Sequence, residues 1–227
     1  MRIRVAVVFL ALIAGGVLHA QNEAIERCLT AAQVLDEVMA TSDRAIPSEL
    51  MNRAHCIAIA PSVKKGGFIF GARYGVGVLS CRGQGGQGWT APSTFRIEGG
   101  SFGLQIGGSA TDVVLLIMNE RGKEKLLRSK FTLGGDAAVA GGPVGRSAQA
   151  QTDALMHAEI LSYSRSRGVF AGVSLEGATL RPVQDANEKI YGRGYTPDQI
   201  LNGQIPPPEA VQPLIATLSK YSSAEHK

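Results

Sequence analysis

The spacing of apolar residues changes early along the chain. Between Ile25 and Met39 they recur every three or four positions, which predicts an amphipathic helix. From Cys56 onward the period is two, which is typical of strands. Residues 56–60 and 113–118 are apolar at every position. Both segments are therefore predicted to be buried strands, and the second is placed in the centre of a sheet.

The rest of the pattern extends this sheet and adds short helices. Further strands are predicted at 67–74, 76–81, 94–98, 101–107, 136–142, 157–165 and 169–175, and short helices at 47–54, 119–128, 185–191 and 209–219. The polar turn at 166–168 joins the last two strands as a hairpin. The 28 glycines fit strands and close backbone contacts better than helices. We therefore expect an α+β fold with a largely antiparallel, strongly twisted or barrel-like sheet and helices at the N- and C-terminal ends.

The first 20 residues have the layout of a secretory signal. Arg2 and Arg4 precede the apolar run 5–18, and Ala20 is followed by the polar Gln21. The alternative, a retained membrane anchor, fits less well because the run is short for a span of about 20 residues and contains two glycines. We expect cleavage after Ala20 and a soluble mature protein in the periplasm or outside the cell.

Charge and composition exclude several classes of function. Signal removal takes two arginines from the 23 basic residues, and the 19 acidic residues then leave a net charge of about +2. This balance does not indicate a nucleic-acid partner. Four scattered histidines and three scattered cysteines do not form a metal-ligand pattern. No metal and no cofactor is predicted.

Catalytic motifs occur as strings but lack their structural context. Residues 99–103 match the nucleophile elbow, which needs a strand, a sharp turn and a helix, whereas Ser101 enters an alternating strand. Residues 83–88 match the dinucleotide fingerprint but precede no helix. Residues 62–65 match the S-x-x-K motif of penicillin-binding enzymes, but neither of the two companion motifs of those enzymes follows. No catalytic residue is predicted. A hydrolase ranks third, after the two binding functions described below.

Basic side chains gather in a predicted turn, along a predicted helix and at a predicted hairpin tip. A solvated surface is the plain explanation, but each basic residue near an anionic membrane adds about 1 kcal/mol of attraction, so a cluster of them favours phosphate head groups. The candidate contacts are Lys64, Lys65, Arg73, Arg121, Lys123, Lys125, Arg128, Lys130, Arg165 and Arg167.

The stretch from about residue 46 to residue 191 resembles the SYLF domain family. The matching segments, in order, are AIAPSVKKGGF (58–68), GARYG (71–75), GSFGLQIGG (100–108), DVVL (112–115), SKFTLG (129–134), GPVGR (142–146) and SYSRSRGVFAG (162–172). The resemblance implies a lipid-binding module without known enzymatic activity. Eukaryotic members of the family associate with phosphoinositides, and some with actin filaments.

For an exported bacterial protein, the resemblance implies affinity for anionic lipid or a membrane surface in the cell envelope, and actin is not an expected partner. The alternative is a structural or protein-interaction module with an envelope protein as its partner. The predicted organisation is a SYLF-like domain at 21–195, including the N-terminal helix, and a C-terminal helical tail at 196–227. That helix, at about 23–40, is acidic in its polar positions, whereas membrane-surface helices are usually basic there. We therefore expect its apolar stripe to pack on the sheet.

Three cysteines in an oxidising compartment allow one disulfide, with three pairings open. Cys56 with Cys81 is favoured because both lie in the β-region, whereas Cys28 lies on the helical stripe. If the strands from residue 56 to residue 81 form a simple meander, however, the two cysteines fall at opposite ends, beyond the usual Cα separation of about 4.4–6.8 Å. The pairing therefore requires a less local strand order.

Overall fold

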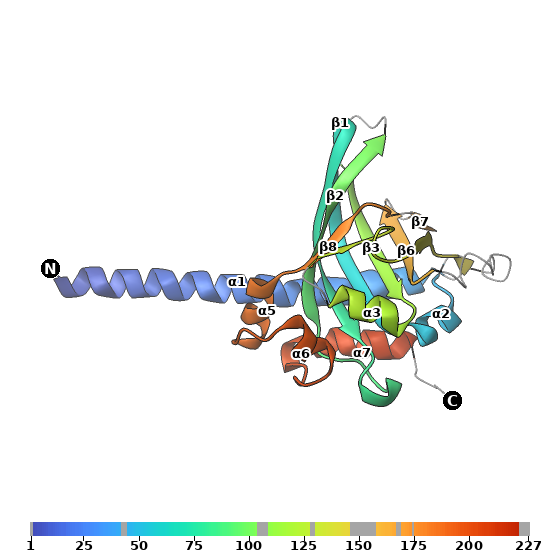
Figure 1. Cartoon of the computed structure of the whole chain (residues 1–227). Helices are drawn as coiled ribbons and strands as arrows, with labels where there is room; N and C mark the ends of the chain where they lie inside the picture. The colour runs from blue at the N-terminus through green and yellow to red at the C-terminus, as the bar shows by residue number, and fades with distance from the viewer. Residues whose placement is uncertain are drawn as a thin grey trace.

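A strongly curled sheet forms a half-barrel, with helices at both ends of the chain (Figure 1). The computed structural model describes residues 2–41, 45–103, 109–127, 130–145, 158–166, 169–173 and 175–222. This architecture confirms the α+β fold expected from the sequence.

In the described part of the chain, eight strands make one sheet, in the order β4-β8-β2-β1-β3-β6-β5, with β7 paired to β6. All of these pairs are antiparallel except β5 with β6. The β6–β7 hairpin confirms the predicted one. The strands are β1 (Cys56–Cys81), β2 (Ser93–Gly103), β3 (Ser109–Ile117), β4 (Phe131–Thr132), β5 (Val139–Gly141), β6 (Ile160–Ser166), β7 (Val169–Gly172) and β8 (Thr179–Pro182).

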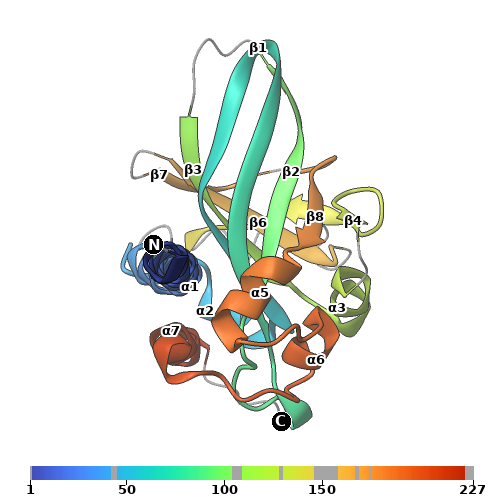
Figure 2. The ribbon, with the colours of Figure 1, turned by 90° about the vertical axis from the view of Figure 1, so that its left-hand side faces the viewer.

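Strand β1 folds back on itself as a long hairpin that extends beyond the helices (Figures 1 and 2). Its first arm pairs with β3 up to Lys65, and its second arm pairs with β2 from Ile69. The prediction of two strands separated at Gly75 was wrong, because that glycine lies inside the second arm. A Cβ atom added there would come within 2.7 Å of a Val63 methyl carbon on the first arm. Gly75 therefore marks a close approach between arms and not a break.

The prediction of two separate strands at 94–98 and 101–107 was wrong for a similar reason. The described part of this region is the single strand β2, which continues through Gly99 and Gly100 to Gly103. Residues 104–107 lie outside the described part. Gly99 packs closely against the backbone of Ala178, with 3.0 Å between an added Cβ atom and the Ala178 Cα atom. A glycine at this position again permits close packing.

Both faces of the sheet are buried near the base of the hairpin. Ile57 and Ile59 face one hydrophobic cluster, whereas Ala58 and Ala60 face the other. This arrangement confirms the strand predicted to be buried on both faces. The central position of β3, between β1 and β6, confirms the placement of residues 113–118.

Helix α1 (Arg2–Met39) covers one face of the sheet with the second half of its length. Cys28, Leu35 and Val38 are fully buried there, which confirms that the apolar stripe packs on the sheet. Asp36 on the same helix accepts hydrogen bonds from Lys220 (2.9 Å) and from the Tyr221 hydroxyl (2.8 Å). Within the part of the chain whose side chains are described, no helix is long and apolar enough to cross a membrane.

The other helices lie around the base of the half-barrel (Figure 2). Asn119 caps α3 as predicted, since its side chain accepts from the Gly122 N–H at 2.8 Å. Helix α6 was not predicted, although Thr196 and Gln199 form a capping box with proline at the first turn, which is a sequence-level start signal. The bounds are α2 (Ser48–Arg53), α3 (Glu120–Leu126), α5 (Gln184–Tyr191), α6 (Pro197–Leu201) and α7 (Gln212–Tyr221), with 3₁₀ turns η1 (Gln84–Gly86) and η3 (Glu209–Val211).

Candidate functional site

A disulfide joins the two ends of the β1 hairpin. Cys56 and Cys81 are bonded, with their Cα atoms 3.9 Å apart. The next pair outward is hydrogen-bonded, since the Arg82 N–H donates to the His55 carbonyl at 2.8 Å. The cysteines therefore occupy a non-hydrogen-bonded position, where opposite Cα atoms are closest. A simple meander would have placed the two cysteines at opposite ends of the strands. This does not happen, because residues 67–81 form one arm of the hairpin rather than two strands.

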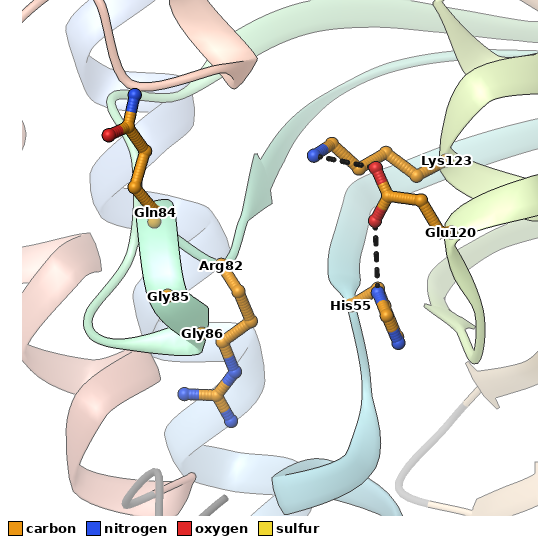
Figure 3. Close-up of a pocket in the computed structure, with 8 residues that line it drawn as sticks. His55, Arg82, Gln84, Gly85, Gly86, Glu120 and Lys123 are labelled. Carbon is orange, nitrogen blue, oxygen red and sulfur yellow. Dashed lines mark hydrogen bonds and ion pairs between the residues drawn. The ribbon is translucent and has the colours of Figure 1, made fainter.

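The residues just outside this disulfide line a cavity of about 420 Å³ (Figure 3). Its wall comes from the chain before β1, the η1 loop after β1 and the first turns of α3. None of the lining residues has an aliphatic side chain, so the cavity suits a polar ligand better than an acyl chain. They are His55, Arg82, Gly83, Gln84, Gly85, Gly86, Glu120 and Lys123.

Glu120 connects the two nitrogen groups of this cavity (Figure 3). One of its carboxylate oxygens lies 3.1 Å from the Lys123 ammonium, and the other lies 3.2 Å from Nδ1 of His55. Burial opposes ionisation of the carboxyl group, but the hydrogen bonds and charges of Lys123 and His55 outweigh it and lower the pKa of Glu120. The carboxylate is therefore ionised at neutral pH.

Arg82 lines the cavity, but its guanidinium is directed away from Lys123 and Glu120 and holds segments of the fold together (Figure 3). Its guanidinium donates to the carbonyls of Met51 (3.3 Å) and Asn52 (3.2 Å) at the end of α2, and to that of Ser222 (2.9 Å) after α7. It also lies 4.2 Å from the centre of the Trp89 ring. Burial lowers the pKa of this guanidinium, and none of the described carboxylates forms an ion pair with it.

Most of the predicted lipid contacts on α3 are neutralised by acidic neighbours. Lys125 binds both oxygens of the buried Glu159, at 3.0 and 2.8 Å, and Arg121 lies 3.4 Å from the same carboxylate. Lys123 is paired with Glu120, as described above. These three cations therefore have structural partners within the chain.

The remaining predicted cations are distributed between several places. Arg165 is held between Asp112, at 2.7 Å, and Glu37 on α1. Lys130 is exposed just before β4. Arg128 and Arg167 lie outside the described residues.

Lys64, Lys65 and Arg73 occupy the far half of the β1 hairpin, and none of the described acidic residues forms an ion pair with them. Because Val63 lies against Gly75 across the arms, Lys65 and Arg73, two residues further along each arm, share one face. Nη1 of Arg73 is buried and has no hydrogen-bond partner among the described residues. Burial also lowers the pKa of this guanidinium.

Helix α3 and the far half of the β1 hairpin lie at opposite ends of the strands (Figure 1). Helix α3 follows Ile117, which pairs with Cys56 at the base of the hairpin. Lys64 lies eight residues further along that arm, which corresponds to about 25 Å at 3.3 Å per residue. The structure therefore places Lys64, Lys65 and Arg73 in the far half of the hairpin, with Lys64 on the face opposite to the other two, and separates them from Arg121, Lys123 and Lys125.

The Glu159 ion pairs predict a pH-dependent stability. Burial would raise the pKa of this carboxyl, but the hydrogen bond and charge of Lys125, the Ala138 N–H and Arg121 together lower it from the ordinary 4.5. Its contribution is therefore present above that value and is lost as the pH falls through the lower, folded-state pKa. We expect Glu159→Gln to lower the free energy of unfolding by about 1–3 kcal/mol at neutral pH.

Thermal melts of both proteins from neutral to acidic pH will measure this effect. The difference in Tm between wild type and variant should narrow as the pH falls. A difference that stays constant across the acidic range would contradict a role for the ionised carboxylate.

Comparison with known proteins defines the family. Residues 98–221 match the Ysc84 family, described as "Las17-binding protein actin regulator". LAS seventeen-binding protein 3 of Saccharomyces cerevisiae is 38% identical over 180 residues, which cover 78% of this chain and 39% of the yeast protein. SH3 domain-containing YSC84-like protein 1 of Homo sapiens is 35% identical over 181 residues, covering 79% of this chain and 52% of the human protein.

The counterpart of the human protein in Xenopus laevis is 35% identical over 202 residues, covering 85% of this chain and 59% of that protein. The chain thus spans roughly two to three fifths of the length of these curated relatives. Their names describe binding proteins and regulators rather than enzymes. The match covers more than half of the chain and confirms the resemblance to SYLF proteins: this chain belongs to the Ysc84 family.

Proposed function

We propose that this protein is an exported, non-catalytic module that binds anionic lipid head groups with the far half of its β1 hairpin. The observation that carries the proposal is the group Lys64, Lys65 and Arg73, which lacks acidic partners among the described residues. Family membership supports a lipid- or actin-associated module without catalytic activity. Export is supported by the Arg2–Ala20 pattern, and N-terminal sequencing of the mature protein should begin at Gln21.

The hairpin cations differ from the other basic residues in that their charges are not paired with described acidic residues. Cations paired inside the protein, such as Lys125 with Glu159, have little attraction left for a membrane. Lys64 and Lys65 keep theirs, and the partly buried Arg73 also has a nitrogen atom without a hydrogen-bond partner. A phosphate group supplies the acceptor oxygens that a guanidinium fork recognises. The cavity at the base of the half-barrel does not suit an acyl chain, because none of its described lining residues is aliphatic.

The first test is co-sedimentation with vesicles of phosphatidylcholine, alone or mixed with phosphatidylglycerol. Lys64→Glu with Lys65→Glu should weaken binding to anionic vesicles at least about tenfold, because each basic residue contributes about 1 kcal/mol near such a surface. Binding by the wild type should fall as salt rises, since the Debye length shrinks from about 10 Å at 0.1 M to about 3 Å at 1 M.

A matched control carries the same change of charge elsewhere. Lys189 and Arg193 are exposed on α5 and just after it, so Lys189→Glu with Arg193→Glu should leave binding close to the wild-type level. Thermal melts of both double variants will show whether they remain folded. Equal binding of the wild type to both vesicle types, or to neither, would instead favour a protein-interaction module. The relatives named as Las17-binding proteins make that the natural alternative.

A further inference from the structure

The cavity at the base of the half-barrel lies far from the hairpin cations, and head-group binding there does not use it. We propose that it is a second site, which binds a small, polar organic oxyanion in the position that the Glu120 carboxylate occupies. The probe ligands are glycerol phosphate and citrate, which share acceptor oxygens and negative charge but differ in the group that carries them.

Glu120 behaves as an internal occupant of this site. Its side chain is 56% exposed, whereas that of Lys123 is only 15% exposed, so the lysine is largely covered by the protein and the carboxylate lies nearer to solvent. A glutamate at the surface reorients readily into water, whereas the lysine remains in place. An incoming carboxylate or phosphate would then accept from Lys123 and His55 in its place (Figure 3).

The charge balance of the cavity favours an anion. Arg82 is hydrogen-bonded to carbonyl oxygens, which satisfy its donors but do not neutralise its charge. When Glu120 turns outward, Lys123 keeps a positive charge in the cavity without its negative partner, whereas the Arg82 guanidinium is directed away from Lys123 and contributes less (Figure 3). Low-dielectric walls strengthen the attraction of such charges for an oxyanion.

The shape of the cavity selects a compact, hydrophilic ligand. Its volume of about 420 Å³ is within the range of small-molecule sites. On the η1 side, Gly85 and Gly86 present backbone to the cavity because they have no side chain. Their φ values of 71° and 76° are ones that other residues rarely adopt, which favours glycine at both positions. No side chain fills the space beside Gly85, where an added Cβ atom would meet nothing within 4 Å. An acyl chain would meet no aliphatic residue among the described lining residues.

Isothermal titration calorimetry and the NMR signals of His55 will test this site with each probe ligand and with glycerol as the uncharged control. Glu120→Gln removes the internal competitor and should tighten oxyanion binding about tenfold, the effect of one charged hydrogen bond. Lys123→Met should weaken it by at least a similar factor. Arg121→Gln, which removes a cation of the same helix outside the cavity, should have no effect.

The double variant Lys64→Glu with Lys65→Glu should bind the probe ligands as the wild type does, so failure of the membrane proposal would leave this one intact. Binding by glycerol phosphate alone would assign the site to phosphate esters, and binding by both would assign it to oxyanions in general. The proposal is overturned if Glu120→Gln binds neither oxyanion, binds them no more tightly than the wild type, or binds glycerol equally well.

Discussion

Replacing Arg82 with alanine is expected to lower the free energy of unfolding by about 3–5 kcal/mol, because several buried carbonyl groups lose their donor at about 1–3 kcal/mol each. The side chain is 7% exposed and joins three segments: the end of β1, the end of α2 and the end of α7. Its removal leaves the carbonyls of Met51, Asn52 and Ser222 without their donors and opens a space beside Trp89. Urea denaturation with an unchanged m-value will measure the loss.

Arg82→Lys provides the informative control. Lysine keeps the positive charge but offers one compact ammonium instead of a planar fork, so it cannot reach the two groups of carbonyls together. We expect a stability between those of the wild type and the alanine variant. A loss below about 1 kcal/mol for Arg82→Ala would mean that water replaces the guanidinium at these carbonyls, and the clamp would then have no large structural role.

Local patterns were sufficient where one stretch of chain determines its own structure. The apolar run at 56–60 predicted a strand buried on both faces, and Ile57 and Ala58 indeed face different clusters. The Asn119 cap of α3 and the β6–β7 hairpin were likewise predicted from neighbouring residues. In each case the residues that decide the structure lie within a few positions of one another.

The errors arose where a distant segment decides the meaning of a residue. A glycine such as Gly75 is typical of a break between strands when only the sequence is considered. The approach of Val63 on the other arm shows why a glycine is needed there. Nothing near Arg82 in the sequence indicates that it joins distant segments, because its partner Ser222 lies 140 positions later.

The candidate site shows the same limit. The sequence places cations at regular positions on α3, but the Glu159 carboxylate that neutralises Lys125 is 34 positions away. Only Lys123 among the predicted contacts lines the base cavity, and His55, Gly85 and Glu120 were not predicted to belong to any site. No local motif links these residues, because it is the pairing of β1 with β3 that brings the hairpin base next to α3.

Loss of the Cys56–Cys81 disulfide is expected to lower the free energy of unfolding by about 3 kcal/mol, a typical value for a crosslink that closes a loop of this length. The bond fixes the two ends of the β1 hairpin, which are 25 positions apart in the sequence. Both sulfurs are buried, so Cys56→Ala with Cys81→Ala removes the crosslink without exposing new polar groups. Urea denaturation with and without dithiothreitol will compare the two proteins, and reductant should destabilise only the wild type.

Cys28 supplies an independent check on the pairing. Its thiol is free, and burial, against a smaller opposing effect of Arg27, raises its pKa to about 12, so it should resist alkylation in the folded protein. Denaturation without reductant should release one reactive thiol per chain, and reduction should then raise the number to the three cysteines of the sequence. Cys28→Ala should remain sensitive to dithiothreitol. Three reactive thiols before reduction, or a peptide that contains Cys28 bridged to either partner, would contradict the crosslink and with it the expected loss of stability.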